Sequence, residues 1–177
     1  MTDTIPQFYF SLRSDLNVLC AAKGKVTPSE FLPKRADAEA TGYDVRCAIP
    51  EGIIVRPGCY VKIPLGFRMF APKGWWLSLA PRSGTFIKKH IHALYGVIDE
   101  TYENEMMFVG QYIPDACDLL SANIDLSIEF GERIAQIIPV ERKSMEVVGL
   151  TPEELDIKYR ERSASRGTGG FGSSGKF

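Results

Sequence analysis

Asp99 is the residue of this sequence whose position best suits chemistry. It ends a short apolar run in which Val97 and Ile98 favour a strand, while Gly96 allows another group to approach the backbone closely. Tyr102 follows three residues later. A carboxylate fixed at a strand end beside an aromatic ring can act as a general base next to a surface for stacking. The alternative is an ordinary strand end with a solvated acid.

A second polar group lies at residues 80–85, which read Ala-Pro-Arg-Ser-Gly-Thr. The guanidinium of Arg82, the hydroxyl of Ser83 and the backbone of Gly84 together suit an anion. The same residue types are also common in turns, so this stretch alone is not specific. We expect it to form a turn that ends a strand.

Two further polar side chains stand in or beside expected strands. Gly42 can supply a turn conformation that places Asp44 at the start of a strand. Residues 133–140 form an apolar strand signal that contains Arg133 and Gln136. Because charged and amide groups in a buried strand need partners, we expect these two side chains to be paired.

The C-terminal residues 166–175 combine five glycines with Arg166, Phe171, Ser173 and Ser174. The glycines make such a backbone mobile until something orders it. A flap with a basic, an aromatic and two hydroxyl side chains can close over a phosphate-bearing base. The stretch also fits the dinucleotide fingerprint and nearly fits a P-loop, but both motifs need a following helix, for which the sequence has no room.

The elements that must position these groups are short strands separated by Gly and Pro turns, which predicts an all-β sandwich or barrel. The cleanest period-two alternation lies at residues 124–130. Thr151, Pro152 and Glu154 predict the start of one short helix. No other helix is expected, and residues 14–34 are predicted to be an irregular connection. The predicted strands are residues 8–12, 44–46, 53–55, 60–63, 67–70, 76–79, 97–98, 106–109, 124–130 and 133–140.

Composition narrows the class of protein. A chain of 177 residues with 45% hydrophobic content predicts one globular domain. A formal net charge of −1 gives no general attraction to nucleic acid or membrane surfaces. We see no signal peptide and no apolar run of membrane-spanning length, so we expect a soluble, cytoplasmic protein. The cysteines have no CxxC spacing and are expected to be reduced: Cys20, Cys47, Cys59 and Cys117.

Five segments taken together resemble the trimeric dUTP pyrophosphatase (dUTPase) family, in the family's order. They read ATGYD at 40–44, PRSG at 81–84, GVIDETY at 96–102, GERIAQ at 131–136 and RGTGGFGSSG at 166–175. The similarity extends over roughly residues 33–175, which is most of the chain.

The resemblance implies a jelly-roll-like β subunit (the β-clip fold) at residues 1–165 and a flexible arm at residues 166–177. It implies a homotrimer in which two subunits form each active site and the arm of the third closes it. The implied reaction is the Mg²⁺-dependent hydrolysis of dUTP to dUMP and pyrophosphate, which limits uracil incorporation into DNA and supplies dUMP for dTTP synthesis.

The resemblance also implies roles for residues at matching positions. Asp99 would activate the water that attacks the α-phosphorus, and Tyr102 would exclude a 2′-hydroxyl. Asp44 and Gln136 would contact Mg²⁺ only through water, because the triphosphate holds the metal. The other implied substrate contacts are Arg82, Ser83, Gly84, Gly96, Val97, Ile98, Met107, Gln136, Arg166, Phe171, Gly172, Ser173 and Ser174.

The sequence departs from the family's pattern at several places. Asn104 stands where the family often has glycine, and Ala93 stands where some members have a side-chain amide. The loops at residues 14–33 and 110–122 are longer than in compact members, and the second could bind a regulatory protein.

Two alternative functions stay open. One is a dCTP deaminase-like enzyme on the same fold, with Glu105 at the edge of the hairpin that follows the GVIDETY segment. The other is a regulatory protein that binds dUTP without turnover.

Overall fold

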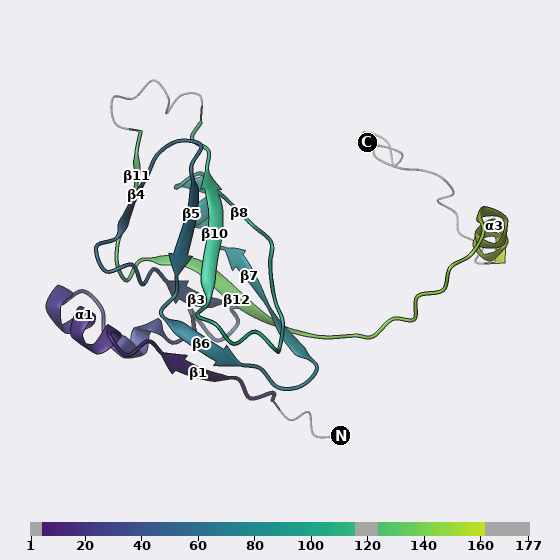
Figure 1. Cartoon of the computed structure of the whole chain (residues 1–177), viewed down its shortest axis with the longest axis horizontal. Coiled ribbons are helices and arrows are strands. Elements are labelled where there is room, and N and C mark those ends of the chain that lie inside the picture. The colour runs from purple at the N-terminus through teal and green to yellow at the C-terminus, as the bar shows by residue number, and fades with distance from the viewer. Residues whose placement is uncertain (1–4, 116–123, 162–177) are drawn as a thin grey trace. The chain divides into compact units, whose positions relative to one another are not determined.

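Antiparallel strands make up most of the regular secondary structure in the described residues (Figure 1). The computed structural model describes residues 5–115 and 124–161. It divides the chain into a first unit, residues 1–143, and a second unit, residues 144–177. The strands are β1 (Tyr9–Leu12), β2 (Lys34–Arg35), β3 (Tyr43–Arg46), β4 (Ile53–Val55), β5 (Tyr60–Pro64), β6 (Phe67–Phe70), β7 (Trp75–Pro81), β8 (Ile91–Ala93), β9 (Gly96–Ile98), β10 (Met107–Tyr112), β11 (Leu126–Ile128) and β12 (Arg133–Glu141).

The described strands form four antiparallel sheets. The largest has five strands in the order β2-β3-β12-β7-β9, and a second has the order β5-β10-β8. Two-stranded sheets pair β1 with β6 and β4 with β11. The predicted all-β architecture is therefore confirmed, and the predicted strand runs are found at or within a few residues of their expected bounds.

Alternating burial explains why these short runs become strands. In β6, Phe67 and Met69 are buried while Arg68 and Phe70 are exposed, and β5 alternates in the same way. β12 lies between β3 and β7, and Ile134, Ala135 and Ile137 of this strand are all buried in the core. The apolar run that predicted this strand therefore supplies side chains of the main core.

Helical turns occur where we predicted an irregular connection and a turn. α1 (Leu16–Lys23) and the 3₁₀ turn η1 (Pro28–Phe31) occupy the predicted irregular connection. Leu16 and Cys20 lie one helical turn apart and pack with Phe31 in a small second core. The predicted turn at residues 80–85 is also wrong in part, because α2 (Ser83–Ile87) begins directly after Arg82.

The second unit contains one described helix, α3 (Pro152–Glu161), which confirms the predicted short helix. Its cap is the one that the sequence predicts: the Thr151 N–H donates to Glu154 Oε2 at 2.8 Å, and the Glu154 N–H donates to Thr151 Oγ1 at 3.3 Å. No residue of α3 is buried. The predicted boundary of the arm, after residue 165, lies outside the described residues.

Three of the cysteines are described, and all three are free thiols: Cys20, Cys47 and Cys59. Cys20 and Cys47 are buried, and burial raises the pKa of the Cys47 thiol to about 11. Cys47 therefore stays protonated and unreactive near neutral pH. Separately, none of the helices in the described ranges is long and apolar enough to cross a membrane.

Candidate active site

An ion-pair cluster around Asp44 forms the first part of the candidate site. The Asp44 carboxylate, only 13% exposed, lies 2.8 Å from Arg82 Nε and 3.2 Å from Arg133 Nη1. β3, β7 and β12 lie side by side in the five-stranded sheet, and this order brings the three residues together. Two guanidinium groups around one carboxylate leave a net positive charge, which suits a phosphate ligand.

α2 carries the other residues of this group. Its N-cap is Arg82 in an extended conformation, and its first two residues are Ser83 and Gly84. The buried Thr85 hydroxyl donates to the Ile134 carbonyl at 2.6 Å, which fixes the helix against β12. Ser83 is exposed, and no atom lies within 4 Å of the position that a Cβ on Gly84 would take. The start of α2 is therefore open to a ligand.

Gln136 lies between this group and Gly42. It is paired with Asp44 on one neighbouring strand and with Ala80 on the other, and its amide donates to the Pro81 carbonyl at 3.1 Å. A Cβ on Gly42 would overlap Gln136 Oε1. We expected Gly42 to supply a turn conformation, but it is not one of the positive-φ glycines of the described chain. Glycine is required here for close packing instead.

The turn that follows β9 carries the second part of the candidate site. Gly96 is paired with Leu79, and a Cβ on Gly96 would lie 2.9 Å from the Leu79 Cβ, so the expected close approach is present. Asp99 comes directly after β9 and is exposed. The Tyr102 N–H donates to the Asp99 carbonyl at 3.1 Å and closes the turn. The carboxylate is thus held at a strand end and open to solvent.

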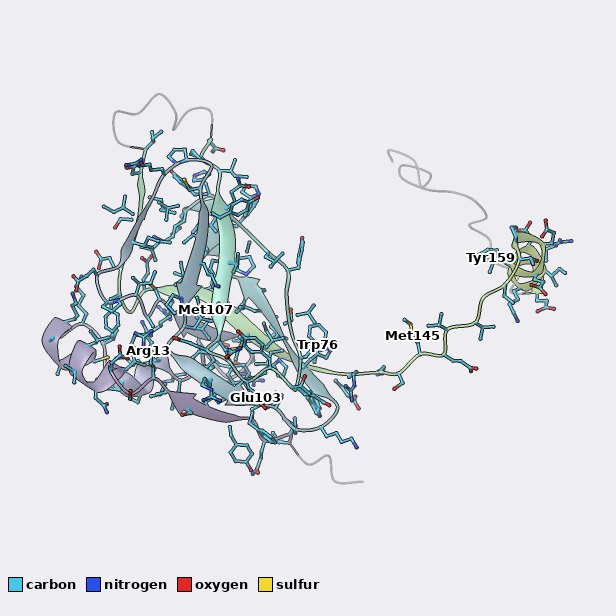
Figure 2. All side chains as sticks on the ribbon, viewed as in Figure 1. Arg13, Trp76, Glu103, Met107, Met145 and Tyr159 are labelled. Carbon is cyan, nitrogen blue, oxygen red and sulfur yellow. The ribbon has the colours of Figure 1, made fainter. Side chains whose placement is uncertain are left out.

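Tyr102 is partly buried, with its ring against the main hydrophobic core. Its hydroxyl donates to the Glu105 carbonyl at 3.0 Å. Both ends of the side chain are therefore fixed, which is what a residue that shapes a binding pocket requires. Met107, the first residue of β10 (Figure 2), is paired with Pro64 and is partly buried.

The two parts of the site lie at opposite ends of β7. Ile98 is opposite Leu77, so Asp99 is next to Trp76 in the register at the start of the strand, whereas Arg82 follows the end of the strand. Trp76 and Arg82 are six positions apart along the chain, which corresponds to about 20 Å at about 3.3 Å per residue. One chain therefore does not bring Asp99 and Arg82 together.

Several expected site residues fall outside the described residues: Arg166, Phe171, Gly172, Ser173 and Ser174. An apolar pocket of about 390 Å³ lies elsewhere on the first unit and is lined by Phe8, Tyr43, Trp75 and neighbouring side chains. None of the predicted site residues lines it. The candidate site therefore does not coincide with this pocket.

The structure adds residues that we did not assign to the site from sequence. Arg133 pairs with Asp44, and the only sequence signal for it was a charged side chain in an apolar strand. Glu100 lies in the Asp99 turn and Glu105 lies after it, and their carboxylates bind glycines and arginines that are distant in sequence. Nothing local in the sequence points to these partners.

A protein-family model and several related sequences match most of this chain. A family model described as dUTPase matches residues 30–175. The chain is 32% identical, over 151 residues, to a deoxyuridine 5′-triphosphate nucleotidohydrolase of Oryza sativa subsp. japonica, with 85% of this chain and 78% of the relative covered. It is 30% identical, over 154 residues, to the protein of the same name in Chlamydia muridarum, with 86% and 96% covered.

Solved structures agree on the fold. The dUTPase of Staphylococcus bacteriophage 80alpha, solved with dUPNHPP, superposes with a TM-score of 0.69 at 23% identity and covers 96% of this chain and 98% of its own. The dUTPase of Streptococcus mutans superposes with a TM-score of 0.60 at 25% identity, covering 78% and 98%. The jelly-roll-like fold that the resemblance implied is thereby confirmed.

Proposed function

Since the chain belongs to the dUTPase family, we propose that it is a dUTP diphosphatase that hydrolyses dUTP to dUMP and pyrophosphate. In a cell this reaction limits uracil in DNA and supplies dUMP. The observation that carries the proposal is the agreement between this family match and the two-part site. A positive cluster at Asp44, Arg82 and Arg133 suits the phosphates, and a solvent-facing Asp99 carboxylate suits the attacking water.

In the proposed mechanism Asp99 accepts a proton from a water molecule, whose oxygen attacks the α-phosphorus. The bond from this phosphorus to the bridging oxygen breaks, and pyrophosphate leaves with the electron pair. Such a displacement needs mainly positioning and neutralisation of charge. Arg82, Ser83 and Gly84 supply these for the phosphates. From the arm, we propose that Arg166 contacts the γ-phosphate and Phe171 stacks on uracil, with Gly172, Ser173 and Ser174 alongside.

Mg²⁺ fits this site as a partner of the triphosphate. In the described part of the chain no group of three or more His, Cys, Asp or Glu side chains is arranged to hold a metal ion. The oxygen atoms of Asp44 and Gln136 are the hard donors that Mg²⁺ prefers, and they suit contacts through water. When bound, the ion would neutralise phosphate charge and orient the triphosphate.

We propose a homotrimer with shared sites, because one chain holds Asp99 and Arg82 about 20 Å apart along β7. A second copy can bring its own Asp99 turn to the Arg82 cluster. Large apolar side chains on α2, β9 and the β8–β9 connection are exposed in the single chain, and Tyr95 is 94% exposed. Such a patch suits a contact with another copy. Its members are Phe86, Ile87, Leu94, Tyr95 and Val97.

Uracil would be read by the backbone of β9, from Gly96 to Ile98, and by β10 near Met107. A deaminase reaction needs a free catalytic carboxylate in that hairpin. The Glu105 carboxylate instead accepts the Gly66 N–H and pairs with Arg13, which favours the hydrolase. A regulatory partner at the 110–122 loop stays a prediction, because residues 116–123 lie outside the described residues.

The decisive experiment measures pyrophosphate release from dUTP, with dTTP, dCTP and UTP assayed in parallel. We expect rapid release from dUTP alone and a strong dependence on Mg²⁺. Ammonia release from dCTP would support the deaminase, and binding of dUTP without pyrophosphate release would support a purely regulatory protein.

Replacing Gly42 with alanine is expected to displace Gln136. The added Cβ overlaps Gln136 Oε1, and the side chain must swing away from the site. We expect kcat/KM for dUTP to fall about two- to tenfold, which corresponds to the loss of one hydrogen bond worth about 0.5–1.5 kcal/mol. The double mutant Gly42→Ala/Gln136→Ala should be no worse than Gln136→Ala alone. Gly149→Ala, where the new Cβ meets no atom within 4 Å, is the control.

Replacing Tyr102 with alanine is expected to reduce the preference for dUTP over UTP. A ring packed against C2′ leaves a ribose hydroxyl buried without a partner, at a cost of about 1–3 kcal/mol. The ratio of kcat/KM values for the two nucleotides should therefore fall at least about fivefold. Tyr102→Phe should be intermediate, because it keeps the ring but loses the bond to the Glu105 carbonyl. An unchanged ratio in Tyr102→Ala would give this residue another role.

A further inference from the structure

Two matching three-residue networks hold the loop that carries Asp99 and Tyr102. Each contains a glycine with positive φ, an arginine and a glutamate. We call them the Glu105 triangle and the Glu100 triangle. One lies at each end of β6, because Gly66 directly precedes this strand and Gly74 lies in the turn that follows it.

The Glu105 triangle joins Gly66, Arg13 and Glu105. Glu105 Oε1 accepts the Gly66 N–H at 3.0 Å and lies 3.1 Å from Arg13 Nη1. The Arg13 N–H donates to the Gly66 carbonyl at 2.8 Å and closes the triangle. A second guanidinium nitrogen of Arg13 donates to the Ala48 carbonyl at 2.8 Å. The arginine is therefore fixed on several sides.

The Glu100 triangle repeats this pattern with Gly74, Arg142 and Glu100. Glu100 Oε2 accepts the Gly74 N–H, and Glu100 Oε1 lies 3.4 Å from Arg142 Nη1. The Arg142 N–H donates to the Gly74 carbonyl at 2.7 Å. The Glu100 side chain is 20% exposed, so the carboxylate is largely removed from solvent. In both triangles one carboxylate binds a backbone N–H and the arginine that faces it.

β6 itself holds the loop between the two triangles. Arg68 Nε donates to the Glu103 carbonyl at 2.6 Å, and the Met106 N–H donates to the Phe67 carbonyl at 2.9 Å. Arg13 and Glu103 are both labelled in Figure 2. The loop is therefore fixed at four positions within seven residues, from Glu100 to Met106.

We propose that Glu100 and Glu105 are positioning residues for the reaction. This rests on the proposed function, in which Asp99 is the base and Tyr102 excludes the 2′-hydroxyl. Glu100 is bonded to Asp99 through the chain, so its triangle sets the position of the base. Glu105 accepts the Tyr102 hydroxyl at its carbonyl, so its triangle sets the position of the ring.

The two triangles predict different kinetic effects. Glu100→Ala frees the Asp99 turn, and kcat should fall about 10- to 100-fold for dUTP, because a shift of about 1 Å at a reacting group can cost about 100-fold. Its dUTP-to-UTP ratio should change little. Glu105→Ala frees Tyr102, and this ratio should fall at least about fivefold, as for loss of the ring itself.

Conservative variants and a control on the same loop separate positioning from folding. Glu100→Gln and Glu105→Gln keep an oxygen that accepts the glycine N–H but lose the charge that pairs with arginine, so each should restore part of the loss. Glu103→Gln is the matched control. The Glu103 side chain makes no hydrogen bond or ion pair within the described ranges, and only its carbonyl is used. It should resemble the wild type in rate and in selectivity.

Kinetic constants are normalised to folded protein, measured from the thermal unfolding transition. Variants of Glu100 and Glu105 that match Glu103→Gln in kcat and in the dUTP-to-UTP ratio would overturn the proposal. If the wild type releases no pyrophosphate from dUTP, the proposed function fails instead. Hydrogen exchange of the Tyr102 amide then still tests the triangles: faster exchange in Glu100→Ala and Glu105→Ala than in Glu103→Ala supports them, and equal exchange refutes them.

Discussion

Asp99→Asn should abolish most turnover of dUTP while leaving the protein folded and able to bind the nucleotide. The change is nearly isosteric, yet an amide cannot accept the proton of the attacking water. General-base catalysis is typically worth about 10²–10⁴-fold, so kcat should fall by at least about 100-fold. Single-turnover pyrophosphate release gives the chemical step, and isothermal titration with a non-hydrolysable dUTP analogue gives the affinity.

Two results would count against Asp99 as the base. One is a loss in kcat below about tenfold, which is too small for a general base. The other is a large loss in affinity for the analogue with little change in the chemical step, which would make Asp99 a binding residue. Glu103→Gln, in the same loop, controls for the removal of one negative charge near the site.

Mixing inactive Asp99→Asn subunits with inactive Arg82→Ala subunits should restore activity. Arg82→Ala removes the guanidinium that pairs with Asp44 and should by itself reduce kcat/KM strongly. A shared site takes Asp99 from one chain and Arg82 from another. After random exchange of equal amounts, about a quarter of the sites in a cyclic trimer combine two intact residues.

The control for this experiment is a mixture of Asp99→Asn subunits with subunits that carry both substitutions, since no site can then be intact. Exchange is followed independently, with a mass tag on one variant and native mass spectrometry. Confirmed exchange without recovered turnover would contradict the shared site. It would also mean that Asp99 and Arg82 do not act together in the reaction.

The strands could be predicted because their signals are local. β5, β6 and β11 each place a polar residue between two apolar ones, and Gly and Pro mark turns along this part of the chain. α1 was missed because a helix of eight residues with one buried turn, Leu16 to Cys20, is too short to show a clear period. α2 has five residues and is held by Thr85, whose partner Ile134 is distant in sequence.

In the candidate site, too, only the features that depend on neighbouring residues could be predicted. The sequence indicates that Asp99 ends a strand and that Arg133 needs a partner, and both statements depend only on neighbouring residues. It cannot indicate that Asp44 is this partner or that Arg82 shares it, because the order of strands in the sheet decides both. The Glu100 and Glu105 triangles could not be predicted either, because their members are distant in sequence.

The triangles also have a consequence for how the protein folds. Arg13 and Glu105 are 92 positions apart, and Gly66 and Glu105 are 39 apart, so these contacts form only after long segments have closed. Contacts between distant residues form slowly, because the entropy of loop closure opposes them until other structure is in place. During refolding, enzymatic activity should therefore recover no earlier than the far-ultraviolet signal of the strands. We therefore expect the turn that carries Asp99 to reach its native position only when Arg13, which follows β1, and Arg142, which follows β12, have both met the residues around β6.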